Sequence, residues 1–223
     1  MLWRVCVGCF SQRDLVSVLG TSLLCRLCSD ELAELRCGAA QISLGGPPLI
    51  DITALYRYQG LIRRLIIRAK VGGDLPALRL LVTLVQVHPT RPALTAWSHV
   101  LMPCASSLWG RVRGRIDIAS QICKEQAHGP LQVVTAPLHL HWRWRKHALL
   151  GRHQRNRGEQ DMPEWFKGLS LRHCTRTLAE AKVEALLLVD DVVTSGDTMR
   201  RTAAAVHAAA PWTFIRGLAL AVS

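Results

Sequence analysis

The chain has 223 residues, 49% of them hydrophobic and 20% charged, which is enough apolar material for one ordinary domain and a small appendage. It contains no apolar run of the roughly 18–20 residues that a membrane-spanning helix needs, and no signal-peptide pattern at its start, so we expect a cytoplasmic protein. The net charge of +12 favours polyanionic partners such as nucleic acid, a phosphorylated ligand or an anionic membrane, without choosing among them.

Five of the eight cysteines lie in the first 45 residues. Four of these form two Cys-x-x-Cys pairs that are separated by fifteen residues: Cys6, Cys9, Cys25 and Cys28. This spacing is typical of a four-thiolate zinc site. Redox-active pairs and simply buried cysteines are the alternatives, but a redox Cys-x-x-Cys motif needs a βαβ context, which this segment lacks. We therefore expect residues 1–45 to be a small module whose folding depends on structural Zn²⁺.

Residues 46–223 are expected to form a second, larger domain, beginning after the Gly-Gly-Pro-Pro break at 45–48. Apolar runs predict strands, and apolar residues at helical spacing predict helices. The expected strands are 50–58, 98–102, 131–136, 186–189 and 214–222, and the expected helices are 60–70, 75–87, 116–126, 178–182 and 199–209. Strands that alternate with helices indicate an α/β domain with a mostly parallel sheet and helices on both faces.

Residues 186–198 combine a buried strand, two adjacent acids and a short polar loop that leads into a helix; they read LLLVDDVVTSGDT. Ligands of open α/β sheets bind outside the carboxyl ends of the strands, and the first N–H groups of a helix bind phosphate. The hydroxyls of Thr194, Ser195 and Thr198 can add to these N–H groups. Gly196 allows the backbone to approach an anion closely.

The two acids of this segment, Asp190 and Asp191, need partners, because a carboxylate repels a neighbouring phosphate. Sugar hydroxyls and Mg²⁺ are both suitable partners. The alternative is that Asp190 caps a turn and that the loop is a plain connector. The complete thirteen-residue pattern favours a ribose 5-phosphate site.

This segment resembles the motif with which type I phosphoribosyltransferases bind phosphoribosyl pyrophosphate (PRPP). The shared pattern is four apolar residues, two acids, two apolar residues and Thr-Ser-Gly-Asp-Thr. The resemblance implies the type I phosphoribosyltransferase fold, with Asp190 and Asp191 on the ribose hydroxyls. The residues that it places around the 5-phosphate are Thr194, Ser195, Gly196, Asp197 and Thr198.

Two further loops lie where this family completes its pocket. Residues 104–116 include Arg113 and Gly114, and the resemblance implies an Arg-Gly step that holds pyrophosphate. The long basic loop at 137–162 includes Arg143 and Lys146 and looks like a lid over the leaving pyrophosphate. Arg113, Arg143 and Lys146 are our candidate catalytic residues. A solvated surface loop is the alternative for each segment.

The chain as a whole resembles the ComF family, because the family's motifs occur in their usual order. After the cysteine module these are Tyr56-Arg-Tyr-Gln-Gly60, Lys70, Gly73-Asp74, Met102-Pro103, Arg113-Gly114, Arg155-Asn156 and the PRPP motif. The family usually has Arg-Gly-Phe-Asn-Gln in the pyrophosphate loop, whereas residues 113–117 read Arg-Gly-Arg-Ile-Asp. This departure favours ligand binding over catalysis.

The resemblance implies a PRPP-dependent phosphoribosyltransferase, a kind of glycosyltransferase, that uses Mg²⁺ and acts with competence proteins in DNA uptake. The alternative is a non-catalytic accessory protein that keeps the fold and binds single-stranded DNA. The charge of +12 and the Arg-flanked Trp142 and Trp144 would suit phosphate contacts and base stacking. Salt-sensitive binding to single-stranded DNA would distinguish the second hypothesis from the first.

Overall fold

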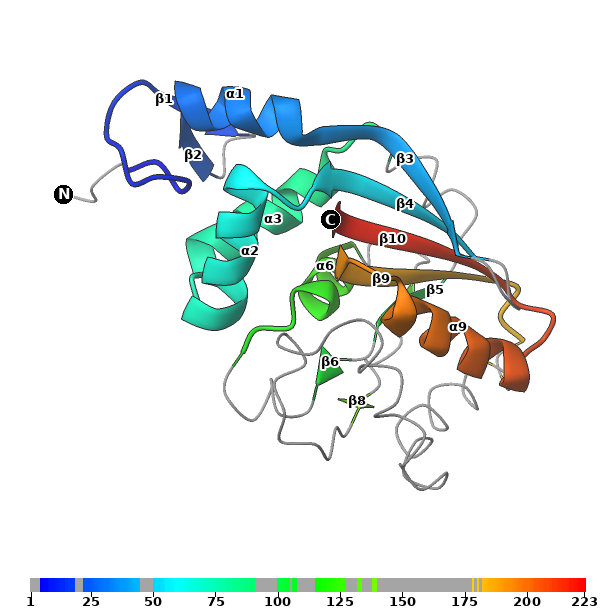
Figure 1. Ribbon diagram of the computed structural model, residues 1–223. Helices are drawn as coiled ribbons and strands as arrows, with labels where there is room; N and C mark the ends of the chain where they lie inside the picture. Colours follow the sequence, from blue (N-terminus) through cyan, green and yellow to red (C-terminus); the bar gives the residue numbers. More distant parts are fainter. Residues whose placement is uncertain are drawn as a thin grey trace.

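A six-stranded sheet in the order β3-β4-β10-β9-β5-β7 forms the centre of the protein (Figure 1). The computed structural model describes residues 5–18, 22–44, 50–90, 100–104, 106–107, 115–126, 132–133, 138–139, 178, 180 and 182–223. The strands are β3 (Arg36–Leu44), β4 (Ile50–Arg57), β5 (Val100–Pro103), β7 (Gln132–Val133), β9 (Ala185–Val193) and β10 (Phe214–Val222). Only β3 is antiparallel to its neighbour. The predicted α/β class with a mostly parallel sheet is therefore confirmed.

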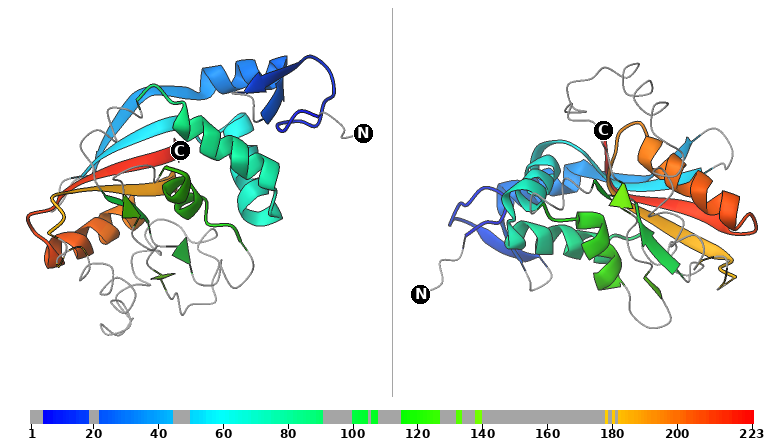
Figure 2. Two further views of the ribbon diagram at one scale, coloured as in Figure 1. Left: turned by 180° about the vertical axis from the view of Figure 1, so that it is seen from behind. Right: turned by 90° about the horizontal axis from the view of Figure 1, so that it is seen from below.

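Helices cover both faces of this sheet. One face packs against α2 (Gly60–Gly72), α3 (Leu75–Gln86) and α6 (Ile118–Gln126), and the opposite face packs against α9 (Asp197–Ala209) (Figures 1 and 2). Alternate residues of β9 supply the two cores: Leu187 on the first face and Leu188 on the second. A strand buried on both faces reads as a continuous apolar run, which is why its sequence identified it so clearly.

The first two predicted helices of the larger domain are confirmed as α2 and α3, and local chemistry sets the boundary between them. Gly73 ends α2 in the left-handed conformation, with φ of 66°. Asp74 then caps α3, because its Oδ1 accepts a hydrogen bond of 3.0 Å from the N–H of Ala77. Pro76 lies in the first turn of α3, where no intrahelical N–H bond is lost.

Strand β9 is longer than the sequence predicted. The apolar run predicts a strand at 186–189 that ends before the acids, whereas β9 continues to Val193. Val192 and Val193 extend the pairing with β10, opposite Ala221 and Val222. β-branched residues favour this extended conformation, so the two acids lie within the last part of the strand.

The N-terminal segment packs onto the same core as the main sheet. It contains β1 (Leu15–Val18), β2 (Ser22–Cys25) and α1 (Arg26–Leu35), and β1 pairs antiparallel with β2. Leu24 and Leu32 belong to the core on the α2 face of the sheet. Strand β3, which falls within the first 45 residues, forms an edge of the main sheet beside β4.

The remaining short elements are β6 (Ser106–Ser107) and β8 (Leu138–His139), which pair in parallel as a separate two-residue ladder. Among the residues that the structure describes, no helix combines the length and the apolar character required to cross a membrane.

Candidate functional site

The four cysteines of the two Cys-x-x-Cys pairs meet at one point. The Sγ atoms of Cys6, Cys9, Cys25 and Cys28, called the cysteine cluster below, all lie within 4.8 Å of one another. Those of Cys9 and Cys25 are 3.5 Å apart. Sulfurs around a tetrahedral zinc with Zn–S bonds of about 2.3 Å lie about 3.8 Å apart, so the four sulfurs are close enough to share one ion. These four residues can therefore bind a metal ion such as zinc.

The backbone around the cluster explains how two short turns present four sulfurs. The Cys6–Phe10 turn is closed by a 2.8 Å hydrogen bond from the Phe10 N–H to the Cys6 carbonyl, and Cys25 stands at the N-cap of α1. Burial acts to raise the pKa of Cys6. Backbone hydrogen bonds outweigh this effect and lower the pKa to about 7, and the bond with Cys25 contributes most among them. Burial raises the pKa of Cys28. A cation among the four sulfurs would stabilise the thiolates that burial disfavours.

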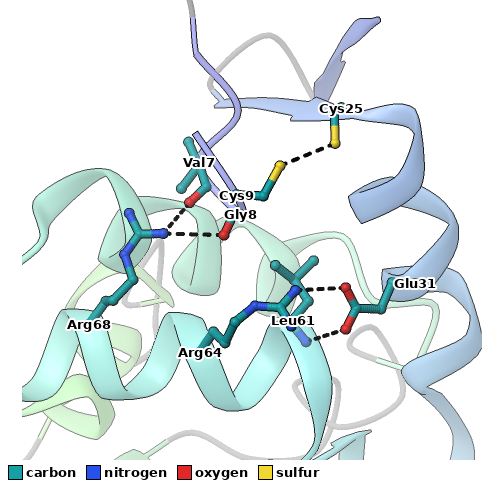
Figure 3. Close-up of polar contacts among 8 residues, drawn as sticks. All are labelled: Val7, Gly8, Cys9, Cys25, Glu31, Leu61, Arg64 and Arg68. Atoms are coloured by element: carbon teal, nitrogen blue, oxygen red, sulfur yellow. Dashed lines mark hydrogen bonds and ion pairs between the residues drawn. The ribbon is translucent and has the colours of Figure 1, made fainter. Parts of the chain in front are cut away.

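Two side-chain bridges tie the cysteine cluster to α2 (Figure 3). The Arg68 guanidinium donates to the carbonyls of Val7 and Gly8, which lie between the first two cysteines, and it also pairs with Asp74. From α1, the Glu31 carboxylate accepts 2.7 Å hydrogen bonds from the Leu61 N–H and from Arg64. Both bridges reach α2, so that helix and the N-terminal segment are held as one unit.

Replacing Glu31 with alanine should lower the free energy of unfolding by about 1–2 kcal/mol, because the first turn of α2 loses the acceptor of its Leu61 N–H. The partner Arg64 is 47% exposed, so its ion pair adds little. Urea unfolding of both Glu31→Ala and Glu34→Ala measures the effect, since Glu34 is exposed on the same helix. The Glu34 variant should stay within about 0.5 kcal/mol of the wild type; equal losses in both variants would refute the role of the Glu31 bond.

A second group of polar residues lies at the carboxyl end of β9. Asp190 and Asp191 are consecutive there, and each carboxylate accepts a hydrogen bond from the next backbone N–H, at 2.8 Å and 3.0 Å. Burial raises the pKa of Asp190 well above its usual range, and the neighbouring Asp191 charge raises it further. Two carboxyl groups this close favour a neutral or cation-bound state over two free charges.

Lys70, from α2, supplies a cation for these acids. Its Nζ forms an ion pair with Oδ2 of Asp191. Burial acts to lower the pKa of Lys70, but the charges of Asp191, Asp190 and Asp117 outweigh it and raise that pKa, so the amine stays protonated. Asp117 comes just before α6, where its Oδ1 accepts a 3.0 Å hydrogen bond from the Ser120 N–H. The acid–lysine site is therefore defined here as Lys70, Asp117, Asp190 and Asp191.

The loop predicted to hold phosphate joins β9 to α9. Thr194 is exposed and Ser195 is half-buried, whereas Gly196 is buried, so only the first part of this loop faces solvent. Gly196 adopts the left-handed conformation, with φ of 74°, at the N-cap of α9. Glycine has no side chain to bond the first N–H groups of the helix, and the Asp197 N–H donates to the Ser195 hydroxyl at 3.4 Å. The N–H groups that follow are candidates for binding an anion. Asp197 accepts hydrogen bonds from the Ser195 hydroxyl and from Arg200, both at 2.8 Å.

The structure brings most of the predicted site residues together in two groups. The cysteine cluster is one group. The other runs along the end of β9 and the start of α9 and contains Asp190, Asp191, Thr194, Ser195, Gly196, Asp197 and Thr198. The remaining predicted residues, Arg113, Gly114, Arg143 and Lys146, lie outside the described residues.

Sequence reasoning did not place Lys70 or Asp117 in this site. Lys70 appeared among the motifs shared with the ComF family, but no role was assigned to it. Asp117 was noted only as a departure from the family pattern. Lys70 is separated from Asp191 by 121 positions, so no local spacing connects them. The available signal was weak: the acids lie near the carboxyl end of β9, α2 follows directly after β4, and parallel strands bring their carboxyl ends to one edge of the sheet.

Comparison with known proteins gives no relative for this chain: no family model matches it, and no curated protein is significantly similar in sequence. The class of protein is therefore defined by the fold and the site themselves. It is an α/β protein with a mostly parallel sheet, a potential metal-binding cluster of four cysteines, and an acid pair beside a helix start.

Proposed function

We propose that this chain is a ComF-like protein of the type I phosphoribosyltransferase class that binds PRPP, or a related ribose 5-phosphate, together with Mg²⁺. The observation that carries the proposal is the junction of β9 and α9. There Asp190 and Asp191 lie in the last part of a central strand, and the helix start with Gly196 at its N-cap follows three residues after Val193. Carboxyl groups that can accept hydrogen bonds from sugar hydroxyls therefore lie beside backbone N–H groups that can bind a phosphate.

Each part of the ligand has a suitable partner in this arrangement. The carboxylates of Asp190 and Asp191 would accept hydrogen bonds from the ribose hydroxyls. The loop at 194–198 and the positive end of α9 would bind the 5-phosphate, with hydroxyls from Thr194 and Ser195. Mg²⁺ would accompany the pyrophosphate, whose charge it neutralises. In the N-terminal segment, the cysteine cluster would hold a structural zinc ion.

The reaction that belongs to this class is the displacement of pyrophosphate from C1 of PRPP by a nucleophile such as a nucleobase. Positioning and charge stabilisation provide most of its catalysis. Arg113, Arg143 and Lys146 are the residues we assign to the pyrophosphate, on the basis of the sequence resemblance. The same resemblance carries the proposed link to DNA uptake and natural transformation.

Replacing both acids is the test of this proposal. Calorimetric titration of the wild type with PRPP and Mg²⁺ should show one site per chain. Asp190→Ala/Asp191→Ala should weaken this binding at least about 100-fold, because both carboxyl acceptors of the ribose hydroxyls are lost. The control is Asp30→Ala/Glu34→Ala, which removes the same charge from exposed positions of α1 and should bind as the wild type does.

Circular dichroism should show that all three proteins are folded before they are titrated. A wild type that does not bind PRPP, or a folded acid-pair variant that binds it as tightly as the wild type, would disprove the proposed site. A protein that binds PRPP but never consumes it, with a broad panel of bases, would support ligand binding without catalysis.

A further inference from the structure

Lys70 is the cation that the fold provides to the acid pair. It lies in the last turn of α2, and its ammonium contacts Asp191 in β9, the fourth strand from the β3 edge. The Lys70 side chain is 42% exposed, whereas that of Asp191 is 10% exposed. The carboxylate is thus sheltered, while the ammonium also reaches solvent at the surface where a ligand would arrive.

Among the described residues, the charges that act on the pKa of Lys70 are negative. The carboxyl groups that act on it come from three positions on two other parts of the chain: Asp190 and Asp191 in β9, and Asp117 before α6. Without a cation, these carboxylates would repel any phosphorylated ligand at the neighbouring loop. Lys70 neutralises one of them, and the raised pKa of Asp190 keeps a second carboxyl from ionising readily.

We propose that Lys70 is a built-in counter-ion that allows this site to bind ribose 5-phosphate without a divalent cation. This inference rests on the proposed function, and it assigns Mg²⁺ to the pyrophosphate part of PRPP rather than to the acid pair. An ammonium group has three N–H donors, of which the bond to Asp191 uses one. Its exposed side can donate another to a ribose hydroxyl or a phosphate oxygen.

Lysine suits this role better than a loosely held metal ion. The ammonium is fixed to α2, and α2 is held in place by the bridges from Arg68 and Glu31 described above. A positive charge that is already in position costs no loss of freedom when the ligand binds. Lys70 therefore acts as a specificity-determining residue that makes an acidic site accept an anion.

The experiment is a calorimetric titration with ribose 5-phosphate in two buffers, one freed of Mg²⁺ without any chelator, so that the cysteine cluster keeps its zinc, and one with added Mg²⁺. For the wild type, the two affinities should agree within about 3-fold. Lys70→Gln keeps a hydrogen-bond donor for Asp191 but loses the charge, and it should bind at least about 10-fold more weakly without Mg²⁺. Mg²⁺ should restore its affinity to within about 3-fold of the wild type, because the metal ion replaces the missing charge.

Two further variants complete the design. Lys124→Met removes one positive charge from an exposed lysine on α6 and should bind as the wild type does in both buffers. Lys70→Met serves as a second neutral variant in case Lys70→Gln does not fold, and the same loss without Mg²⁺ is expected of it.

The outcomes separate this inference from the proposed function. A neutral Lys70 variant that binds normally without Mg²⁺, or a wild type that requires Mg²⁺ for ribose 5-phosphate, would overturn the role of Lys70 and leave the site itself intact. A folded wild type that binds ribose 5-phosphate in neither buffer would overturn the proposed function, and the role of Lys70 with it.

Discussion

Replacement of Cys28 with serine is expected to release zinc and to unfold the N-terminal part of the protein. Cys28 is buried in the first turn of α1, and its sulfur completes the cysteine cluster. In isolated zinc-finger peptides the metal contributes about 10–16 kcal/mol of apparent folding energy. Part of the core beneath the cluster would remain, so we expect a loss of at least about 3 kcal/mol, a large fraction of the stability of a typical domain.

The measurement combines elemental analysis with thermal unfolding. The wild type should carry about one zinc ion per chain, and Cys28→Ser should carry almost none and unfold at a lower temperature. Cys37→Ser is the matched control, because Cys37 is also buried but stands in β3, outside the cluster. A wild type without zinc after growth in zinc-supplemented medium, or two serine variants with equal zinc content, would contradict the assignment.

The second large effect is expected from Gly217→Ala in β10. A Cβ added at Gly217 would lie 2.8 Å from Cγ1 of Ile52 and still closer to the sulfur of Met199. Both neighbours are fully buried, so neither can move aside without disturbing the core. Overpacking of this kind costs about 1–3 kcal/mol, which should lower the melting temperature by about 2–10 °C.

This substitution should also weaken ligand binding at a distance, because Met199 lies in the first turn of α9, directly after the phosphate loop. Gly72→Ala is the control: a Cβ there meets no atom within 4 Å, and the stability should be unchanged or slightly higher. Differential scanning calorimetry and titration with ribose 5-phosphate measure the two effects. If Gly217→Ala and Gly72→Ala have the same melting temperature, α9 does not pack on the sheet as closely as described.

The sequence predicted the candidate site only where its residues are close together along the chain. The cysteine pairs and residues 186–198 are short segments whose spacing carries the chemistry directly. The partner of Asp191 was not predictable in this way, because Lys70 reaches it through the packing of α2 against the sheet. The end of β9 was also misplaced, since its pairing with β10 extends the strand through both acids.

By itself, the sequence determined the α/β class, the main helices and strands, and the two groups of residues able to carry chemistry. It could do so because hydrophobic periodicity, glycine positions and cysteine spacing act over a few residues. The tertiary structure alone decided that β3 joins the main sheet, that Arg68 and Glu31 fasten the cysteine cluster to α2, and that Lys70 pairs with Asp191. These contacts depend on strand order and helix packing, which join residues far apart in the chain and leave no local pattern.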